Sequence, residues 1–284
     1  MAEDNRMKGK VILITGGTDG IGKEAVKQLA IMGGTIVIVG RNLEKTENVI
    51  TELKSITGNK DISFLIADLS AQSEIRNLAQ NFRERYKRLD VLVNNAGSVF
   101  LRRRLSVDGI EMTFALNHLA YFLLTNLLLD ILKASAPSRI VNTSSGSHLR
   151  GKINYIDVNL SRGYFIQRSY GQSKLANVMF TFELASRLEG TGVTANCFHP
   201  GFVKTNMGVH YNQIVRWLKP LIFQTGIPVE DGAETLVYLA SSPEVDGING
   251  KYFYRLKPRR TNPLANDKEG QKWLWEISER LVGM

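Results

Sequence analysis

The sequence is poor in cysteine and has no long apolar run. The one cysteine among its 284 residues, Cys197, excludes an internal disulfide and any metal site built from several cysteines. It lies in an apparent strand, where a buried and inert thiol is expected. The most apolar stretch, 119–132, is broken by Thr125 and Asp130 and falls short of the roughly 20 apolar residues that span a bilayer. The N-terminus also lacks an apolar signal core, so we expect no transmembrane anchor. We further expect no bound metal and a reducing compartment, most simply the cytoplasm.

The formal net charge is +9, but the basic clusters do not form the pattern of a nucleic-acid-binding module. The clusters at 102–104 and 257–260 contain arginine and lysine without interleaved aromatic residues. Solvated charge is the simplest interpretation, and attraction to a membrane surface or an acidic ligand is the alternative. The hydrophobic fraction of 43% supports a substantial core and argues against disorder.

Short β-branched runs alternate with amphipathic helical patterns along most of the chain, with no linker between them. The expected strands are 10–15, 35–39, 62–67, 90–93, 139–143, 193–198 and 250–254. The expected helices are 21–32, 43–56, 71–86, 107–132, 170–188 and 228–240, and the tail 262–284 is expected to be an amphipathic helix throughout. This order predicts one α/β domain over residues 1–284, a doubly wound Rossmann-type three-layer fold with a mostly parallel sheet of six or seven strands.

Three stretches stand outside this alternation. Residues 1–8 are expected to be a flexible N-terminus, and 150–169 is a polar insert. The stretch 203–227 holds Trp217 and several other apolar side chains, and we expect it to form a flap over a substrate pocket. An ordinary packed helix pair is the alternative for that stretch.

A glycine-rich turn joins the first expected strand to the first expected helix, and it reads Thr15-Gly16-Gly17-Thr18-Asp19-Gly20-Ile21-Gly22. Glycine permits positive φ and lets the backbone approach a ligand closely. The N-terminus of the following helix offers unpaired N–H groups and the positive end of the helix dipole to a phosphate. The spacing differs from the commoner Gly-x-Gly-x-x-Gly pattern. The strand before the turn and the helix after it nevertheless favour a dinucleotide pyrophosphate site over a purely structural turn.

The end of the second strand favours NADP over NAD. A strand that meets the adenosine ribose carries Asp or Glu at its tip when it binds the 2′-hydroxyl of NAD, and here the tip is Arg41-Asn42. The Arg41 guanidinium suits a phosphate monoester, although it could instead be a surface arginine paired with Glu44. Asp68, followed by Leu69, ends the third strand and is expected near the adenine amino group, or else as the N-cap of the next helix.

Tyr170 and Lys174 are the candidates for acid–base chemistry. They are four residues apart on a helical pattern and therefore share one face. Tyrosine has a reference pKa of about 10, and a nearby ammonium together with a cationic nicotinamide favours the phenolate. Ser145 follows the strand 139–143, where its hydroxyl could orient a substrate carbonyl. The alternative makes Ser145 a turn residue and Tyr170 a surface tyrosine.

With these motifs the chain resembles the short-chain dehydrogenase/reductase family, and within it the retinol dehydrogenase-like branch. The matching family pieces are Thr15-Gly16-x-x-x-Gly20-Ile21-Gly22, Asn94-Asn95-Ala96-Gly97, Asn117, Ser145, Tyr170-x-x-x-Lys174 and His199-Pro200-Gly201. The branch is indicated by Arg41-Asn42, Asn117-His118-Leu119, Phe122-Leu123-Leu124-Thr125, Ser173-Lys174-Leu175-Ala176-Asn177 and Leu274-Trp275-Glu276-Ile277-Ser278. The separation of 25 residues between Ser145 and Tyr170 (170 − 145) is also similar to that branch.

The resemblance implies a role for each of these residues. Tyr170 would exchange a proton with the reacting oxygen, Lys174 would lower the pKa of Tyr170 and hold the nicotinamide ribose, and Ser145 would hydrogen-bond the reacting oxygen. Asn117 would support a water relay to Lys174. The expected cofactor-binding set is Gly16, Thr18, Gly20, Ile21, Gly22, Arg41, Asn42, Asp68, Leu69, Asn95, Ala96, Gly97, Tyr170, Lys174, Pro200, Gly201, Val203 and Thr205.

The function expected from these observations is an NADP-dependent oxidoreductase that interconverts a carbonyl, an aldehyde or ketone of lipophilic character, and an alcohol. A catalytically silent NADP-binding sensor or scaffold is the alternative, and a third hypothesis is reduction of a C=C bond in a tetrapyrrole or enone. The expected partner is a small-molecule substrate and not a nucleic acid, and self-association into a homo-oligomer is left open.

Overall fold

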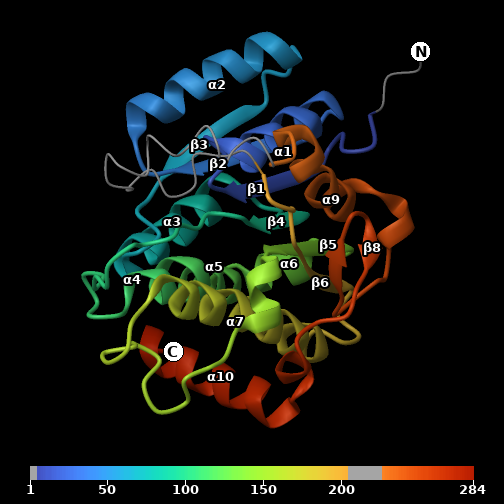
Figure 1. Ribbon diagram of the computed structural model, residues 1–284. Coiled ribbons are helices and arrows are strands. Elements are labelled where there is room, and N and C mark those ends of the chain that lie inside the picture. The colour runs from blue at the N-terminus through green and yellow to red at the C-terminus, as the bar shows by residue number, and fades with distance from the viewer. Residues whose placement is uncertain (1–4, 204–225) are drawn as a thin grey trace.

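An eight-stranded sheet runs through the middle of the molecule in the computed structural model, which describes residues 5–203 and 226–284 (Figure 1). The strands are β1 (Val11–Thr15), β2 (Thr35–Gly40), β3 (Ile62–Ile66), β4 (Val91–Asn94), β5 (Ser138–Thr143), β6 (Val193–Phe198), β7 (Tyr252–Tyr254) and β8 (Lys257–Pro258). Their order across the sheet is β3-β2-β1-β4-β5-β6-β7-β8, and only the pair β7 and β8 is antiparallel. The expected doubly wound arrangement is thus confirmed, and β8 is a short addition at the edge.

The central strands are continuous apolar runs because both of their faces are covered. Every residue of β1 is buried, as is every residue of β4. Such runs are typical of parallel strands between two helical layers. β8 exists because the chain reverses at Arg255 and Leu256, which both have positive φ, the backbone of a two-residue hairpin turn.

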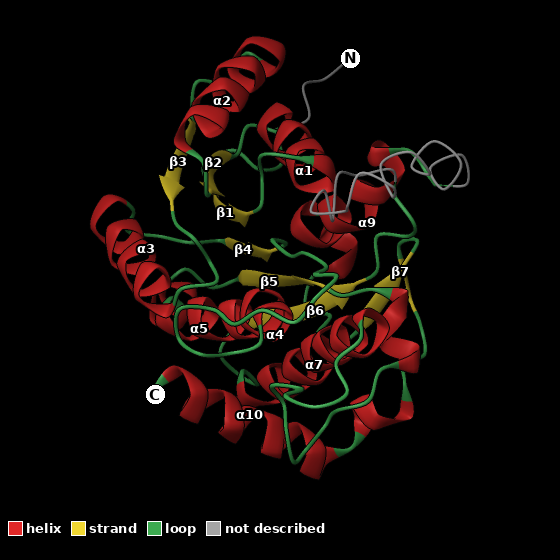
Figure 2. Ribbon diagram, turned by 60° about the vertical axis from the view of Figure 1, so that its left-hand side comes forward, coloured by secondary structure: helices red, strands yellow, loops and turns green. Residues whose placement is uncertain are grey.

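Helices cover both faces of the sheet, as Figure 2 shows. One layer holds α1 (Gly20–Ile31), α2 (Leu43–Thr57) and α9 (Val229–Ser241). The other holds α3 (Gln72–Arg85), α5 (Ala120–Leu127) and α7 (Ile166–Arg187), with α10 (Lys268–Val282) packed on the outside of α7. The shorter elements are α4 (Met112–Phe114), the π-helical turn η1 (Ala115–Leu119), α6 (Leu129–Ala134) and the 3-10 turns η2 (Gly146–Arg150), η3 (Pro243–Val245) and η4 (Pro263–Asn266).

The strand order reverses between β1 and β4, which are neighbours in the sheet. In open α/β sheets a ligand binds in the crevice beyond the carboxyl ends of the strands at such a reversal. The glycine-rich turn follows β1, and Asn95 follows β4. The topology therefore brings the two motifs together.

The expected single helix 107–132 is wrong at its start and in its continuity. A tight turn precedes the helix: the backbone N–H of Ser106 donates to the carbonyl of Ile110, and Gly109 has φ of +74°. The helix begins only at Met112. Glu111 is its N-cap, and the Glu111 carboxylate accepts hydrogen bonds from the N–H groups of the first turn. It then passes through the π-turn η1 and breaks again at Leu128. Apolar spacing does not reveal such changes of helix type because they alter the backbone and not the residue pattern.

Several other expectations concern the ends and the stretch 203–227. The tail helix begins at Lys268, since Asp267 caps it and the preceding residues form η4. Residues 1–4 lie outside the described residues, whereas Met7 is buried and its N–H donates to the carbonyl of Met32. Most of the expected flap also lies outside the described residues; at its ends Val203 forms a parallel bridge with Ile227.

Candidate active site

A cavity of about 400 Å³ lies at the carboxyl ends of the central strands. It is lined by residues from the glycine-rich turn, the ends of β2 and β4, the stretch after β5, and helix α7. Fifteen of the sequence-predicted site residues line it, namely Gly16, Thr18, Gly20, Ile21, Arg41, Asp68, Leu69, Asn95, Ala96, Gly97, Ser145, Tyr170, Lys174, Pro200 and Gly201. The cofactor motif and the acid–base motif therefore face one space.

The glycine-rich turn forms a cradle that side chains would fill. A Cβ on Gly22 would lie 2.2 Å from the carbonyl oxygen of Gly16, and a Cβ on Gly16 would lie 2.9 Å from Cα of Ala96. Gly16 also has φ of +68°, which favours glycine. Asp19 caps α1 by accepting from the N–H of Gly20. Because the glycines have no side chains, a dinucleotide pyrophosphate could approach the N-terminus of α1 closely and accept hydrogen bonds from its backbone N–H groups.

Thr15 ties this turn to the strand on the other side of the reversal. Its Oγ1 accepts hydrogen bonds from the backbone N–H groups of Asn95 (2.8 Å) and Ala96 (3.1 Å). The Asn95 amide in turn donates to the Thr15 and Gly16 carbonyls over 3.2 and 3.3 Å, and its oxygen accepts from the Thr143 hydroxyl. These bonds fix the distance between the cradle and the opposite wall of the cavity.

At the tip of β2, Arg41 lines the cavity and is exposed. Among the described residues no ion pair joins Arg41 to Glu44, which removes the surface pairing considered from the sequence. The neighbouring ion pair is instead Lys45 with Asp19, at 2.9 Å. Asn42 does not line the cavity; its side chain caps α2 by accepting from the N–H of Lys45.

Asp68 lies on the cavity wall and is not the N-cap of the next helix. Helix α3 is capped by Ala71, which makes no side-chain cap hydrogen bond. Asp68 Oδ1 accepts instead from the N–H and the hydroxyl of Ser70, at 2.9 and 2.8 Å. This local turn holds the carboxylate at the end of β3, where an adenine would be met.

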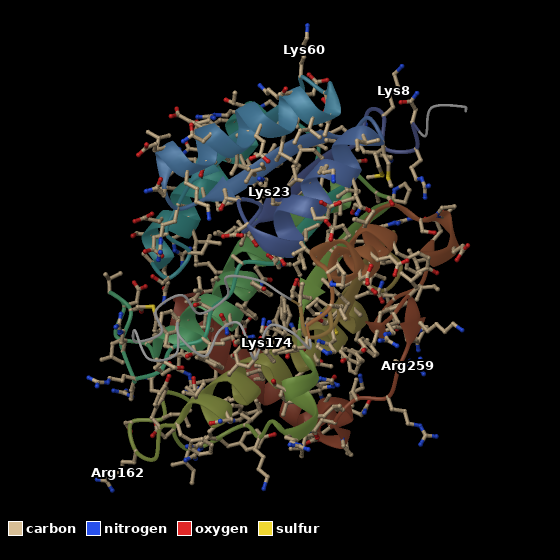
Figure 3. The ribbon with its side chains drawn as sticks, turned by 45° about the horizontal axis from the view of Figure 1, so that its top comes forward. Lys8, Lys23, Lys60, Arg162, Lys174 and Arg259 are labelled. Atoms are coloured by element: carbon tan, nitrogen blue, oxygen red, sulfur yellow. The ribbon has the colours of Figure 1, made fainter. Side chains whose placement is uncertain are left out.

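Lys174 is the buried cation of the site. Figure 3 shows it in the middle of the molecule, whereas Lys60, Arg162 and Arg259 extend outward. Its residue surface is 3% exposed, and its Nζ donates to the Thr143 carbonyl oxygen at 3.0 Å. Burial lowers the pKa of Lys174 to about 7, because an ammonium loses its hydration there. A small change in environment therefore decides how much of this amine is charged near neutral pH.

Tyr170 and Ser145 share the cavity wall with Lys174. The Lys174 Nζ lies 5.7 Å from the centre of the Tyr170 ring, so the phenol and the amine are neighbours as the helical spacing predicts. Ser145 Oγ accepts from the N–H of Ser147 at 3.2 Å, and Ser145 therefore also caps the turn η2. Ser145 is therefore a turn residue, and this does not prevent its hydroxyl from also orienting a substrate carbonyl.

Asn117 lies behind the cavity wall, within the π-turn η1. Its side chain is fully buried and bridges both backbone groups of Ser98: Oδ1 accepts from the N–H at 2.8 Å, and Nδ2 donates to the carbonyl at 3.0 Å. Nδ2 also donates to the Ser173 hydroxyl at 3.1 Å. Single π-turns within helices are frequent at functional sites because they reorient backbone groups.

A buried amide network under the strand ends was not predicted from the sequence. The Asn94 amide on β4 donates to Thr125 and Asn142, and the Asn142 amide on β5 donates to Thr181, each over 2.9 to 3.0 Å. Both asparagines are fully buried. Polar residues within otherwise apolar strands are the signal that could have revealed this network.

Some expected residues do not line the cavity. Gly22 and Asn117 lie behind its wall, Val203 is in the bridge with Ile227, and Thr205 is outside the described residues. The cavity wall also contains residues that were not predicted from the sequence, among them Asp19, Val39, Gly40, Ala67, Ser98, Phe100, Leu116, Thr143 and Ser144. Most of these residues belong to no recognisable motif; they line the cavity because they lie at or near the ends of strands.

Two features outside the cavity bear on earlier expectations. Cys197 is fully buried, and burial raises the pKa of its thiol to about 12, which makes the thiolate scarce. In the part of the chain that the structure describes, none of the helices is long and apolar enough to cross a membrane. The cytoplasmic location stays a prediction.

Comparison with known proteins agrees with this geometry. A model of the short chain dehydrogenase family matches residues 10–215. Human retinol dehydrogenase 14 is 41% identical over 298 residues, covering 98% of this chain and 88% of the relative, and human retinol dehydrogenase 13 is 41% identical over 97% of this chain and 85% of the relative.

Among solved structures, an uncharacterised protein from Mycobacterium paratuberculosis superimposes with a TM-score of 0.80 at 31% identity, covering 98% of this chain and 95% of that chain. The active-site complex of Pseudomonas aeruginosa RhlG with NADP superimposes with a TM-score of 0.71 at 26% identity, covering 89% of this chain and 97% of that chain. The chain therefore belongs to the short-chain dehydrogenase family, in its retinol dehydrogenase-like branch, and is an oxidoreductase that acts on CH–OH groups with a nicotinamide cofactor.

Proposed function

We propose that the protein is an NADP-dependent oxidoreductase that interconverts a lipophilic aldehyde or ketone and its alcohol, with Tyr170 as the acid–base residue. The observation that carries the proposal is the convergence of Tyr170, Lys174 and Ser145 on one cavity with the glycine cradle. The nicotinamide, when bound there, supplies or accepts the hydride. Every other task falls to residues of the chain.

Tyr170 moves the proton. In reduction its hydroxyl gives a proton to the carbonyl oxygen, and in oxidation the phenolate takes the proton of the alcohol. The Lys174 ammonium, 5.7 Å from the ring centre, stabilises the negative charge that develops on the phenol. Ser145 lines the same cavity, and its hydroxyl would orient the reacting oxygen by a hydrogen bond.

Arg41 supports NADP as the cofactor. It lies on the cavity wall at the tip of β2, where the adenosine ribose would be bound, and no described acidic side chain is paired with it. A guanidinium without an acidic partner is free to form charge-assisted hydrogen bonds with a 2′-phosphate. Solved relatives that hold NADP or NADPH agree with this choice.

Apolar residues support a lipophilic substrate. Phe100 and Leu116 line the same cavity as Tyr170. Phe202 follows the wall residue Gly201 in the sequence and is 59% exposed. Apolar walls with a few converging polar groups are typical of sites for small organic ligands. The retinol dehydrogenases among the relatives make a long apolar alcohol the first class to try.

The experiment is a turnover assay with NADPH and a panel of aldehydes and ketones that includes retinal, followed by nicotinamide absorbance. We expect turnover by the wild type and a loss of roughly 100- to 10,000-fold in Tyr170→Phe, because the proton donor is removed. NADPH affinity, measured by fluorescence titration, should hardly change. Tyr86→Phe is the matched control, since its hydroxyl is hydrogen-bonded to Ser63 and neither residue lines the cavity.

Two outcomes would overturn parts of this proposal. Retained activity in Tyr170→Phe would remove Tyr170 from its role. Tight NADPH binding without turnover on any member of the panel would favour the catalytically silent sensor instead.

A further inference from the structure

Three residues from distant parts of the chain meet behind Lys174. They are His118 in the π-turn η1, Asn177 in α7 and Ser278 in α10, and all three are fully buried. His118 Nε2 lies 2.9 Å from Ser278 Oγ, and His118 Nδ1 lies 3.4 Å from Asn177 Oδ1. None of the three lines the cavity.

The hydrogen bonds of Asn177 fix its orientation. Its Nδ2 donates to the Asn117 carbonyl oxygen at 2.9 Å and to the Thr143 carbonyl oxygen at 3.2 Å. A flipped amide would place its own oxygen against these two acceptors, so Oδ1 has to point toward His118.

This orientation in turn fixes the proton of His118. An amide oxygen only accepts, so Nδ1 of the ring has to carry the hydrogen in the contact with Asn177. Nε2 is then an acceptor. The single hydrogen of the Ser278 hydroxyl can go to the Leu274 carbonyl oxygen at 2.7 Å or to His118 Nε2 at 2.9 Å, and this tautomer requires that it goes to Nε2. Replacing any member leaves a buried polar atom without a partner, which makes the three residues one unit.

The unit reaches the catalytic lysine through one shared atom. The Thr143 carbonyl oxygen accepts from the Lys174 Nζ at 3.0 Å as well as from Asn177. The Asn177 amide and the Lys174 ammonium therefore share the Thr143 carbonyl oxygen as their acceptor. A shift of its amide would change the environment of Lys174 without any contact with the cavity.

The apolar surroundings of His118 favour its neutral form. Its ring packs against Phe114, Phe122 and Phe180, with ring centres 4.9, 6.4 and 6.0 Å away. Burial lowers the pKa of His118 to about 3, so it stays uncharged at ordinary pH. Within residues 5–203 and 226–284, the titratable groups that face Lys174 are Tyr170 on its own helix and Tyr121 on α5, whose ring centres both lie 5.7 Å from the amine.

We propose that Ser278, His118 and Asn177 form a positioning relay that sets the environment of Lys174, so that helix α10 takes part in the acid–base step. The relay rests on the proposed function for its effect on turnover. Its geometry is testable without turnover. In this arrangement none of the three residues touches the substrate; each acts through Thr143 and Lys174.

The direct test is the tautomer of His118, read by ¹⁵N NMR on protein with labelled histidine and assigned with His118→Gln. The relay requires the hydrogen on Nδ1. A hydrogen on Nε2 in the wild type would overturn it. Because this measurement needs no substrate, it remains informative if no turnover is found and the proposed function fails.

The second test is the titration of Lys174, followed by NMR of ¹³C-labelled lysine side chains and assigned with Lys174→Met. In Asn177→Asp the carboxylate cannot donate to the Thr143 carbonyl, and its charge favours the ammonium. The titration midpoint of Lys174 and the matching limb of the kcat–pH profile should move up by about one pH unit or more. An unchanged midpoint in folded Asn177→Asp would contradict the relay.

Ser278→Ala with Ser135→Ala as its control covers the case in which Asn177→Asp does not fold. Both serines are buried, and both hydroxyls can donate to the carbonyl four residues earlier at 2.7 Å. A purely structural role predicts the same result for both: a lower Tm with an unchanged lysine titration. The relay predicts that only Ser278→Ala changes the Lys174 midpoint; an unchanged midpoint in both variants would refute it.

Discussion

The two halves of the cavity are built on opposite principles. On the side of β1 and α1, the wall consists of backbone that side chains would obstruct, as the 2.2 Å between a Cβ on Gly22 and the Gly16 carbonyl shows. On the side of β5 and α7, the wall depends on buried side chains, with Lys174 and Asn177 each partnered. Thr15 joins the two halves through the N–H groups after β4.

The difference indicates how each half fails. A backbone cradle loses its function when atoms are added, whereas a side-chain network loses it when atoms are removed or a charge is changed. The first depends on glycine and helix position and the second on complete hydrogen bonding. Substitutions on the two sides should therefore affect different properties: cofactor affinity on the side of the cradle, and turnover and its pH dependence on the side of the side-chain network.

The largest effect is expected from Gly22→Ala. The added Cβ overlaps the Gly16 carbonyl, so α1 and the turn must separate, with a cost of about 1–3 kcal/mol in stability and loss of most NADPH affinity. Fluorescence titration and thermal denaturation measure both effects. Gly58→Ala is the control, since no atom lies within 4 Å of its added Cβ and only its φ of +69° is strained. Unchanged NADPH affinity in Gly22→Ala would show that the cradle does not hold the cofactor.

On the catalytic side, Lys174→Met should abolish most turnover while raising stability at low pH. Burial lowers the pKa of Lys174 to about 7 from an ordinary value of 10.5. Between these values the unfolded state binds more protons, so the contribution of this group to wild-type stability increases as pH rises. Below about pH 7 the folded protein must keep a buried ammonium, and there the variant should exceed the wild type by its widest margin.

The measurement is the difference in Tm between the two proteins from pH 6 to about pH 10, in which the other titrating groups cancel. We expect the margin of the variant to shrink steadily across this range. A constant margin would mean that the Lys174 amine does not titrate differently in the folded state.

The smallest of these effects concerns cofactor choice at the tip of β2. Arg41→Asp should lower the ratio of kcat/KM for NADPH to that for NADH by roughly 10- to 100-fold, since it removes charge-assisted hydrogen bonds and adds repulsion. Turnover with NADH serves as the internal control for folding. An unaltered ratio would defeat the assignment of Arg41 to the 2′-phosphate.

The sequence carried strong local signals for the fold and for much of the site. β-branched runs identified the seven parallel strands because buried strands are apolar on both faces. The glycine spacing and the Tyr170–Lys174 spacing are likewise local, since each motif acts within one turn of chain. These residues line the same cavity because a doubly wound sheet brings its strand ends together.

The layered fold, the glycine cradle and the face shared by Tyr170 and Lys174 thus follow from local patterns in the sequence. The contacts of His118 with Asn177, 59 positions along the chain, and with Ser278, 160 positions along it, do not. Nor does the π-turn that interrupts the expected helix. Local periodicity indicates burial, whereas the partner of a buried polar group depends on how the helices pack, and packing is a property of the whole fold.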